Sequence, residues 1–210
     1  MNHEWKKSEK HIYLPPEKPG LIHVPSFRFF TIEGSGDPND DTFAEYIGVL
    51  YSLAYAVKMS PKKGMAPEGY AGYTVYPLEG VWDLTPEGRK APNGRFDKKD
   101  LVFKLMIRQP DFVEEGFAME IIRWVKKNKT HELIDQVKFE QIEEGDCIQM
   151  LHKGSYDDEP AGFSRMEAYA EQLNYRRKSK VHREIYLSDA RKVAPEKLRT
   201  VLRFMVEKLV

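Results

Sequence analysis

The feature that most constrains the fold of this chain is a short pattern that occurs twice, 120 residues apart. Gly34-Ser35 is followed by Phe43, and Gly154-Ser155 is followed at the same spacing by Phe163. In each copy an apolar strand-like run precedes the turn, and an amphipathic helical pattern and further strand-like runs follow it. This order favours a duplicated strand-helix-strand-strand unit. We therefore predict an α+β fold of two tandem repeats with pseudo-two-fold symmetry and a ligand cleft between them.

Changes in composition along the chain set the expected boundaries. The first residues are charged and end in a run rich in proline and glycine, which favours an arm rather than a central strand or helix. After Pro110, Asp111 and Glu114 have the spacing of a capping box, which predicts a helix between the repeats. The predicted parts are an N-terminal arm at residues 1–20 and a single ligand-binding domain at 21–210, with repeat one at about 21–110, a linking helix at about 111–128 and repeat two at about 133–210.

Composition also limits the partners. Lysine plus arginine equals aspartate plus glutamate at 33 each, so no net charge draws the chain to nucleic acid or to an anionic membrane. Cys147 is the only cysteine, which leaves no internal disulfide. The N-terminus lacks the apolar run of a signal peptide, and no segment has the length of a membrane span. We expect a cytoplasmic protein, a monomer or homodimer, with no nucleic acid or membrane partner.

The sequence lacks the motifs of several common metal-binding, nucleotide-binding and nucleophilic sites. The six histidines form no closely spaced cluster, and one cysteine cannot build a structural zinc site. The glycines at Gly34-Ser35-Gly36 match neither a dinucleotide fingerprint nor a P-loop, and neither a G-x-S-x-G elbow nor a thiol-nucleophile signature is found. We therefore expect no metal and no cofactor. Carboxylate, phenol and aromatic side chains remain as the candidate functional groups.

Glu184 is the carboxylate with the most distinctive surroundings. The stretch Val181 to Asp189 alternates, with Ile185 among the apolar positions on one side, interrupted by Arg183. The other side carries His182, Glu184, Tyr186 and Ser188. An ordinary solvated strand face is one reading of this pattern. In a partly dry pocket, the same glutamate could bind a cationic or hydrogen-bond-donating ligand, or act as a general base toward water.

Five separated runs together resemble the stand-alone GyrI-like small-molecule-binding proteins. The runs are Ile32–Asn39, Tyr73–Trp82, Lys104–Pro110, Gly154–Pro160 and His182–Asp189. The resemblance covers about residues 21–204 and implies two strand-helix-strand-strand modules of the SHS2 type with a cleft between them. Relatives include ligand-sensing domains of multidrug-responsive regulators, where a pocket glutamate meets cationic drugs. Some stand-alone members instead hydrolyse spirocyclopropane-bearing, DNA-alkylating natural products.

The resemblance also implies the site residues. The family's strand glutamate matches Glu184, and Tyr156 is the expected hydrogen-bond donor beside it. Arg183 stands where members often have histidine, and the C-terminal tail is longer than theirs. No helix-turn-helix flanks the domain, which disfavours a DNA-binding regulator. The positions expected to contact the ligand are Trp82, Tyr76, Phe163, Tyr186, Met106 and His182.

Three functions are compatible with these observations. The first is hydrolysis of hydrophobic cyclopropanoid genotoxins, a detoxification in which Glu184 orients or deprotonates the attacking water and Tyr156 stabilises the developing phenolate. The second is non-catalytic multidrug binding, which sequesters a hydrophobic aromatic or cationic small molecule. The third, suggested only by the family name, is a gyrase-modulating partner protein. Mass analysis of the recovered ligand separates the first two.

Overall fold

The computed structural model describes residues 2–91, 96–129 and 131–209. The chain divides into two compact units, each built from segments that are not contiguous in sequence. The first unit consists of Met1–His3, Phe27–Leu78 and Trp82–Ile142, and the second of Glu4–Ser26, Glu79–Val81 and Glu143–Val210. Residues 92–95 lie outside the described residues. None of the described helices has the length and apolar character needed to cross a membrane.

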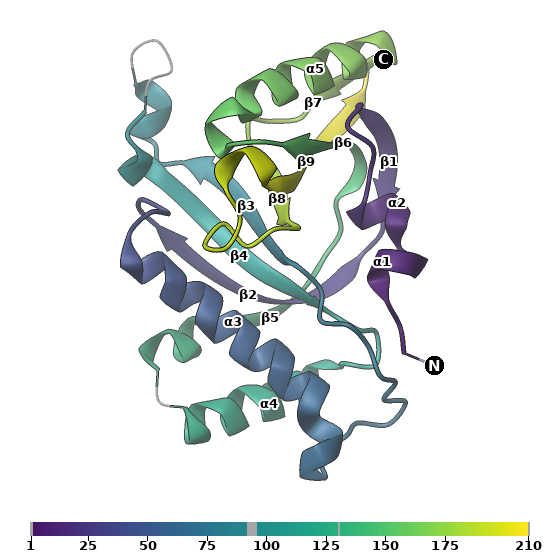
Figure 1. Ribbon diagram of the computed structural model, residues 1–210, viewed down its shortest axis with the longest axis vertical. Coiled ribbons are helices and arrows are strands. Elements are labelled where there is room, and N and C mark those ends of the chain that lie inside the picture. The colour runs from purple at the N-terminus through teal and green to yellow at the C-terminus, as the bar shows by residue number, and fades with distance from the viewer. Residues whose placement is uncertain (1, 92–95, 130, 210) are drawn as a thin grey trace. The chain divides into compact units, whose positions relative to one another are not determined.

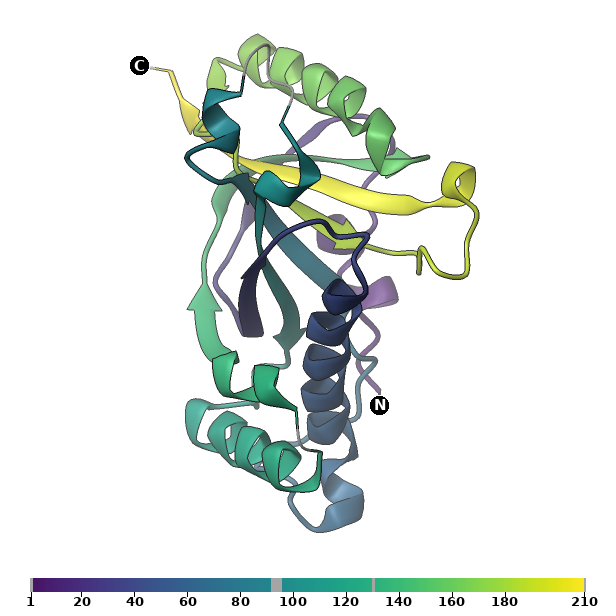
Figure 2. The same cartoon turned by 90° about the vertical axis from the view of Figure 1, so that its left-hand side faces the viewer.

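In the first unit, an antiparallel sheet is backed by two helices that lie side by side (Figures 1 and 2). Strand β2 lies between β4 and β5. Helix α3 packs on β2 and β4 through Leu50, Leu53 and Val57, which are fully buried and recur at helical spacing. The elements of this unit are β2 (Phe27–Ser35), α3 (Asp41–Met59), η1 (Ser60–Lys63), η2 (Gly88–Lys90), η4 (Lys98–Asp100), β4 (Leu101–Gln109), α4 (Glu115–Asn128), η5 (Glu132–Gln136) and β5 (Lys138–Ile142).

Helix α4 begins at Glu115, four residues later than the predicted linking helix. The predicted capping box at Asp111 does not form, and Glu114 is the N-cap without a side-chain hydrogen bond. Arg28 supplies the physical reason. Its guanidinium donates to the carbonyl oxygens of Asp111 and Val113, at 2.8 and 3.0 Å, so these carbonyls are engaged outside any helix.

The second unit is an antiparallel sheet in the order β1-β6-β9-β8, with β7 paired to β9. Helix α5 lies on β6, β7 and β9 (Figure 1). The elements are α1 (Trp5–Ser8), α2 (Lys10–Tyr13), β1 (Gly20–Val24), β6 (Gly145–Lys153), η6 (Tyr156–Asp158), α5 (Glu159–Gln172), β7 (Tyr175–Arg177), β8 (His182–Tyr186), η7 (Pro195–Lys197) and β9 (Arg199–Lys208). Strand β3 (Leu78–Leu84) contributes its residues Glu79–Val81 to this unit and its remaining residues to the first.

An apolar core lies between α5 and its sheet. Its buried residues are Ile148, Met150, Met166, Ala170, Leu202, Phe204 and Val206. Gly162 allows the helix to lie close to the sheet, because a Cβ at this position would stand 3.1 Å from the Leu202 side chain. Pro160 lies in the first turn of α5, where its missing amide costs no helical hydrogen bond. The core therefore fixes the beginning of α5 over β9 and the neighbouring strand β8.

The segment predicted as an N-terminal arm packs into the second unit. Residues 4–20 form α1, α2 and the start of β1, and Trp5, Ile12 and Tyr13 are buried. The charged composition concealed this, because the apolar side chains are few and widely spaced. The mixed α/β class with antiparallel sheets is as predicted. The tandem strand-helix-strand-strand repeat stays a prediction. The pseudo-two-fold relation and the cleft stay predictions.

Candidate functional site

Three side chains of the second unit converge at the point where α5 begins beside β8. Glu159 is the first residue of α5, and His182 and Glu184 come from alternate positions of β8. One nitrogen or oxygen atom from each residue lies within 4.8 Å of the others. His182 Nε2 lies 3.1 Å from Glu184 Oε1. Because residues two apart on a strand point to the same face, the alternation at 182 and 184 places the imidazole beside the carboxylate. We call Glu159, His182 and Glu184 the carboxylate–imidazole cluster.

Both carboxyl groups of this cluster are buried, and burial strongly perturbs the pKa of Glu159. Glu159 is 5% exposed and Glu184 is 8% exposed. Desolvation, followed by the negative charge of Glu184, raises the pKa of Glu159 to about 10. Glu159 therefore holds a proton at neutral pH. Among the described residues, Glu159 Oε1 has no hydrogen-bond partner.

Tyr156 lies in η6, immediately before α5, and is 37% exposed. Burial of its hydroxyl group, together with the charge of Glu184, raises the pKa of the Tyr156 phenol to about 12. The phenol is therefore protonated at neutral pH and can donate a hydrogen bond. Its ring meets Tyr186 edge to face, with 6.1 Å between centroids. A partly exposed donor thus lies close enough to Glu184 to sense its charge.

Phe163, one turn into α5, positions the imidazole. Its ring contacts His182 in a T-shaped arrangement, with 4.6 Å between ring centroids. Phe163 also packs against the apolar core of the second unit. This packed aromatic contact holds one side of the His182 ring beside α5.

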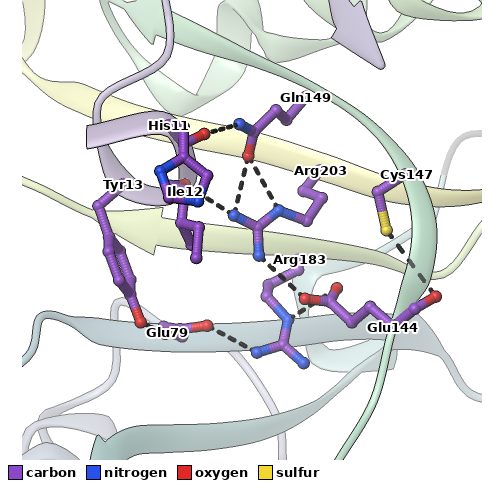
Figure 3. Close-up of polar contacts among 9 residues, drawn as sticks. All are labelled: His11, Ile12, Tyr13, Glu79, Glu144, Cys147, Gln149, Arg183 and Arg203. Carbon is purple, nitrogen blue, oxygen red and sulfur yellow. Dashed lines mark hydrogen bonds and ion pairs between the residues drawn. The ribbon is translucent and has the colours of Figure 1, made fainter. Parts of the chain in front are cut away.

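The opposite face of β8 is anchored by a buried ionic network (Figure 3). Arg183 contacts Glu79 through Nη1 at 2.6 Å and Glu144 through Nε at 3.0 Å. Glu144 also accepts from Arg203 Nη1 at 2.9 Å. Burial acts to raise the pKa of Glu144, but the charges of Arg183 and Arg203 outweigh it and hold the pKa below its ordinary value. Arg183, which interrupts the apolar side of the strand pattern, is thus a buried anchor for β8.

The same network holds the N-terminal segment. Arg203 donates through Nη2 to the carbonyl oxygen of Ile12 at 2.8 Å, and Gln149 donates to the carbonyl oxygen of His11 at 2.6 Å. Tyr13 donates to Glu79 at 3.5 Å (Figure 3). Arg183 on β8 and Arg203 on β9 are opposite each other in the register of the two antiparallel strands. The same buried ionic network therefore anchors both β8 and residues 11–13.

Three predicted ligand contacts belong to the first unit and are buried there. Trp82 packs against Phe43 and Phe103, with ring centroids 5.9 and 5.5 Å away. Tyr76 has the Arg108 guanidinium 4.6 Å from its ring centroid. Met106 is fully buried. The five predicted positions that the structure brings together are those of the second unit: Tyr156, Phe163, His182, Glu184 and Tyr186.

Glu159 is the residue that sequence reasoning missed. It precedes Pro160 in the first turn of a helix, where acidic residues are common because they complement the helix dipole. That ordinary role conceals its approach to Glu184. A hollow of about 240 Å³ elsewhere on the second unit is lined by Glu167, Glu171, Arg176, Arg177, Ser179 and Lys180. This hollow does not include Glu184.

A family model for the GyrI-like small-molecule-binding domain matches residues 17–207. The chain belongs to the GyrI-like family. The matched region of this GyrI-like protein contains all three residues of the carboxylate–imidazole cluster. No curated protein matches the chain significantly.

Solved structures agree with this family membership. A protein described as a hydrolase from Listeria innocua is 33% identical to this GyrI-like chain, with a TM-score of 0.88, and the match covers 98% of this chain and 100% of that one. An uncharacterized conserved protein from Listeria innocua is 34% identical, with the same TM-score and coverage. The C-terminal domain of EcmrR, at 14% identity and a TM-score of 0.55 over 91% of this chain and 98% of that one, shares the fold.

Proposed function

We propose that this GyrI-like protein hydrolyses hydrophobic cyclopropanoid compounds by water attack assisted by Glu184. Small-molecule binding is the shared property of the family. A solved relative at 33% identity over nearly the whole chain is described as a hydrolase, which supports hydrolysis as the reaction type. The observation that carries the proposal is the buried Glu184 carboxylate, held 3.1 Å from His182 Nε2 and beside the phenol of Tyr156.

The proposed reaction adds one water molecule across a strained carbon–carbon bond. Glu184 orients the water and accepts its proton as the oxygen bonds to the ring carbon. The electron pair of the broken bond moves through the conjugated system to the substrate's carbonyl oxygen, which becomes a phenolate as that ring aromatises. The Tyr156 O–H stabilises this charge by a hydrogen bond, and the phenolate then takes a proton. His182 keeps the Glu184 carboxylate in place.

Charge distribution in the site supports these roles. Because Glu159 holds a proton at neutral pH, it cannot take the proton of the attacking water, and Glu184 is the carboxyl group assigned to that role. The raised pKa of Tyr156 keeps the phenol protonated, so it acts as a donor rather than as a competing anion. Aromatic side chains at Tyr156, Tyr186 and Phe163 offer contact area for a flat substrate.

Mass analysis of a spirocyclopropane substrate after incubation tests the proposal. Wild-type protein should give the ring-opened product with the mass of one added water. Glu184→Gln keeps the size of the side chain but removes the base, so the rate should fall by about 10²- to 10⁴-fold. Glu171→Gln, an exposed glutamate of the same helix α5, is the matched control and should leave the rate unchanged. Full activity in Glu184→Gln would refute the mechanism.

Non-catalytic binding is the second candidate, and the two buried carboxyl groups of the site favour it for cationic aromatic ligands. In that case the ligand is recovered unchanged while Glu184→Ala weakens saturable binding. Fluorescence titration with a lipophilic cation, followed by mass analysis of the same sample, separates binding from turnover. An unchanged ligand with Glu184-dependent affinity would replace hydrolysis by sequestration as the function.

A further inference from the structure

The carboxylate–imidazole cluster has the composition of a metal site. It offers two carboxylate oxygens and one imidazole nitrogen, within 4.8 Å of one another and from two different elements. In a tetrahedral zinc site with bonds of about 2.1 Å, neighbouring ligand atoms lie about 3.4 Å apart, so small side-chain rotations would bring the three onto one ion. The His182–Glu184 pair, at 3.1 Å, already has such a spacing.

Charge balance at this cluster points to a cation. Within the described part of the chain, neither Glu159 nor Glu184 forms an ion pair with a lysine or arginine, and His182 is the only basic contact. Two buried carboxylates that share a site cannot both stay ionised without a counter-charge. A divalent cation supplies such a counter-charge. Glu159 Oε1, buried and without a partner, is an oxygen that such an ion would engage.

The surroundings of His182 suit a ligand histidine. Its Nδ1 lies 3.4 Å from the carbonyl oxygen of Lys180, the kind of backbone acceptor that commonly orients a metal-bound imidazole. With Nδ1 protonated toward that carbonyl, the Nε2 lone pair can bind an ion that is shared with Glu184 Oε1, 3.1 Å away. Phe163 holds one side of the ring.

We propose that Glu159, His182 and Glu184 bind one divalent transition-metal ion of the zinc class. Mixed imidazole and carboxylate ligands suit Zn²⁺ and its first-row neighbours better than Ca²⁺ or Mg²⁺, which prefer oxygen alone. The sequence predicted no metal because the three residues are spread over positions 159 to 184 and lack a known ligand motif. This site does not depend on hydrolysis. Because the ion takes an oxygen of Glu184, the metal-bound protein would lose its base, and zinc would inhibit the proposed reaction.

Calorimetric titration of the chelator-treated full chain with zinc chloride at pH 7 tests the site. We expect one Zn²⁺ per chain. Glu159→Gln and His182→Gln should each weaken the affinity at least about tenfold, because both remove a direct ligand. Glu171→Gln should bind as the wild type does.

Two further readouts keep the result interpretable. Thermal unfolding in the presence of chelator shows whether each variant is folded, and the visible spectrum of bound Co²⁺ reports low-symmetry coordination independently of stability. Absence of binding, or equal affinity in wild type, Glu159→Gln and His182→Gln, would overturn the site. Hydrolysis measured in chelator keeps the two proposals separate. Zinc binding without turnover refutes only the hydrolase, and turnover without zinc binding refutes only the metal site.

Discussion

Replacing Arg203 by methionine probes how the second unit holds its N-terminal segment and β8. Arg203 is 2% exposed and donates to Glu144, Gln149 and the carbonyl oxygen of Ile12. Methionine retains apolar volume but leaves these acceptors without their donor. Breaking one side of a buried ion pair costs about 3 to 5 kcal/mol, and each buried unsatisfied acceptor costs about 1 to 3 kcal/mol. Because Arg183 still pairs with Glu144, we do not add the acceptor costs to the ion-pair cost, and we expect a loss of about 3 to 5 kcal/mol in total.

Urea denaturation of wild type and variants measures this loss. Arg176→Met is the matched control, because Arg176 is also a strand arginine that pairs across to a glutamate, at 2.6 Å, but is exposed. Its replacement should change the free energy of unfolding by no more than about 1 kcal/mol. In the double variant Arg203→Met/Glu144→Leu, the cost should fall short of the sum of the single costs by about 1 to 3 kcal/mol, since both changes remove the same contact.

The reasoning fails if Arg203→Met costs no more than Arg176→Met. It also fails if the two single costs simply add, because additivity would mean that Glu144 and Arg203 do not stabilise each other. A loss of stability accompanied by normal zinc affinity or turnover at saturating ligand would show that the network supports the fold without setting the geometry of the carboxylate–imidazole cluster.

Two other perturbations follow from burial in the second unit. The pKa of Glu159 is about 10 in the folded chain, against an ordinary value of 4.5. Between these pH values the unfolded chain binds fewer protons than the folded chain, so the free energy of unfolding falls as pH rises. Glu159→Gln removes this dependence. Denaturation in chelator should show that the stability of the variant relative to the wild type rises by on the order of 2 to 4 kcal/mol from pH 5 to pH 8. An equal stability difference at both pH values contradicts the raised pKa of Glu159. A chain that starts at residue 17, where the family match begins, loses the buried Trp5, Ile12 and Tyr13. It should be less stable by at least about 4 kcal/mol, measured from the midpoint and slope of urea denaturation. An unchanged midpoint would show that these residues do not stabilise the fold.

The strand pattern around Glu184 predicted its local structure well. Two-residue alternation placed His182 and Glu184 on one side, and the structure pairs them at 3.1 Å. The alternation could not show that both lie beside the start of α5, because that contact depends on how the helix packs. It also could not assign Arg183. An arginine within an apolar row is ambiguous until its partners Glu79 and Glu144 are known, and these lie 104 and 39 residues away in the sequence.

Local signals failed where tertiary contacts outweighed them. The capping box predicted at Asp111 was wrong because Arg28 engages the carbonyl oxygens there. The N-terminal residues looked like an arm because charged side chains outnumber the apolar ones that become buried. Glu159 was missed for a related reason. An acidic residue in a first helical turn already has an ordinary explanation, and only its unusual burial identifies a second role.

The discontinuity of the second unit has a consequence during synthesis. Ile12 leaves the ribosome early, yet the arginine that binds its carbonyl oxygen is 191 residues downstream. At roughly 5 to 20 residues per second, the wait is about 10 to 40 seconds. All of the first unit's segments up to Ile142 emerge during this interval, so that unit can fold while the carbonyl oxygen of Ile12 still lacks Arg203. The N-terminal segment of the second unit is therefore completed only when the last strand, β9, appears.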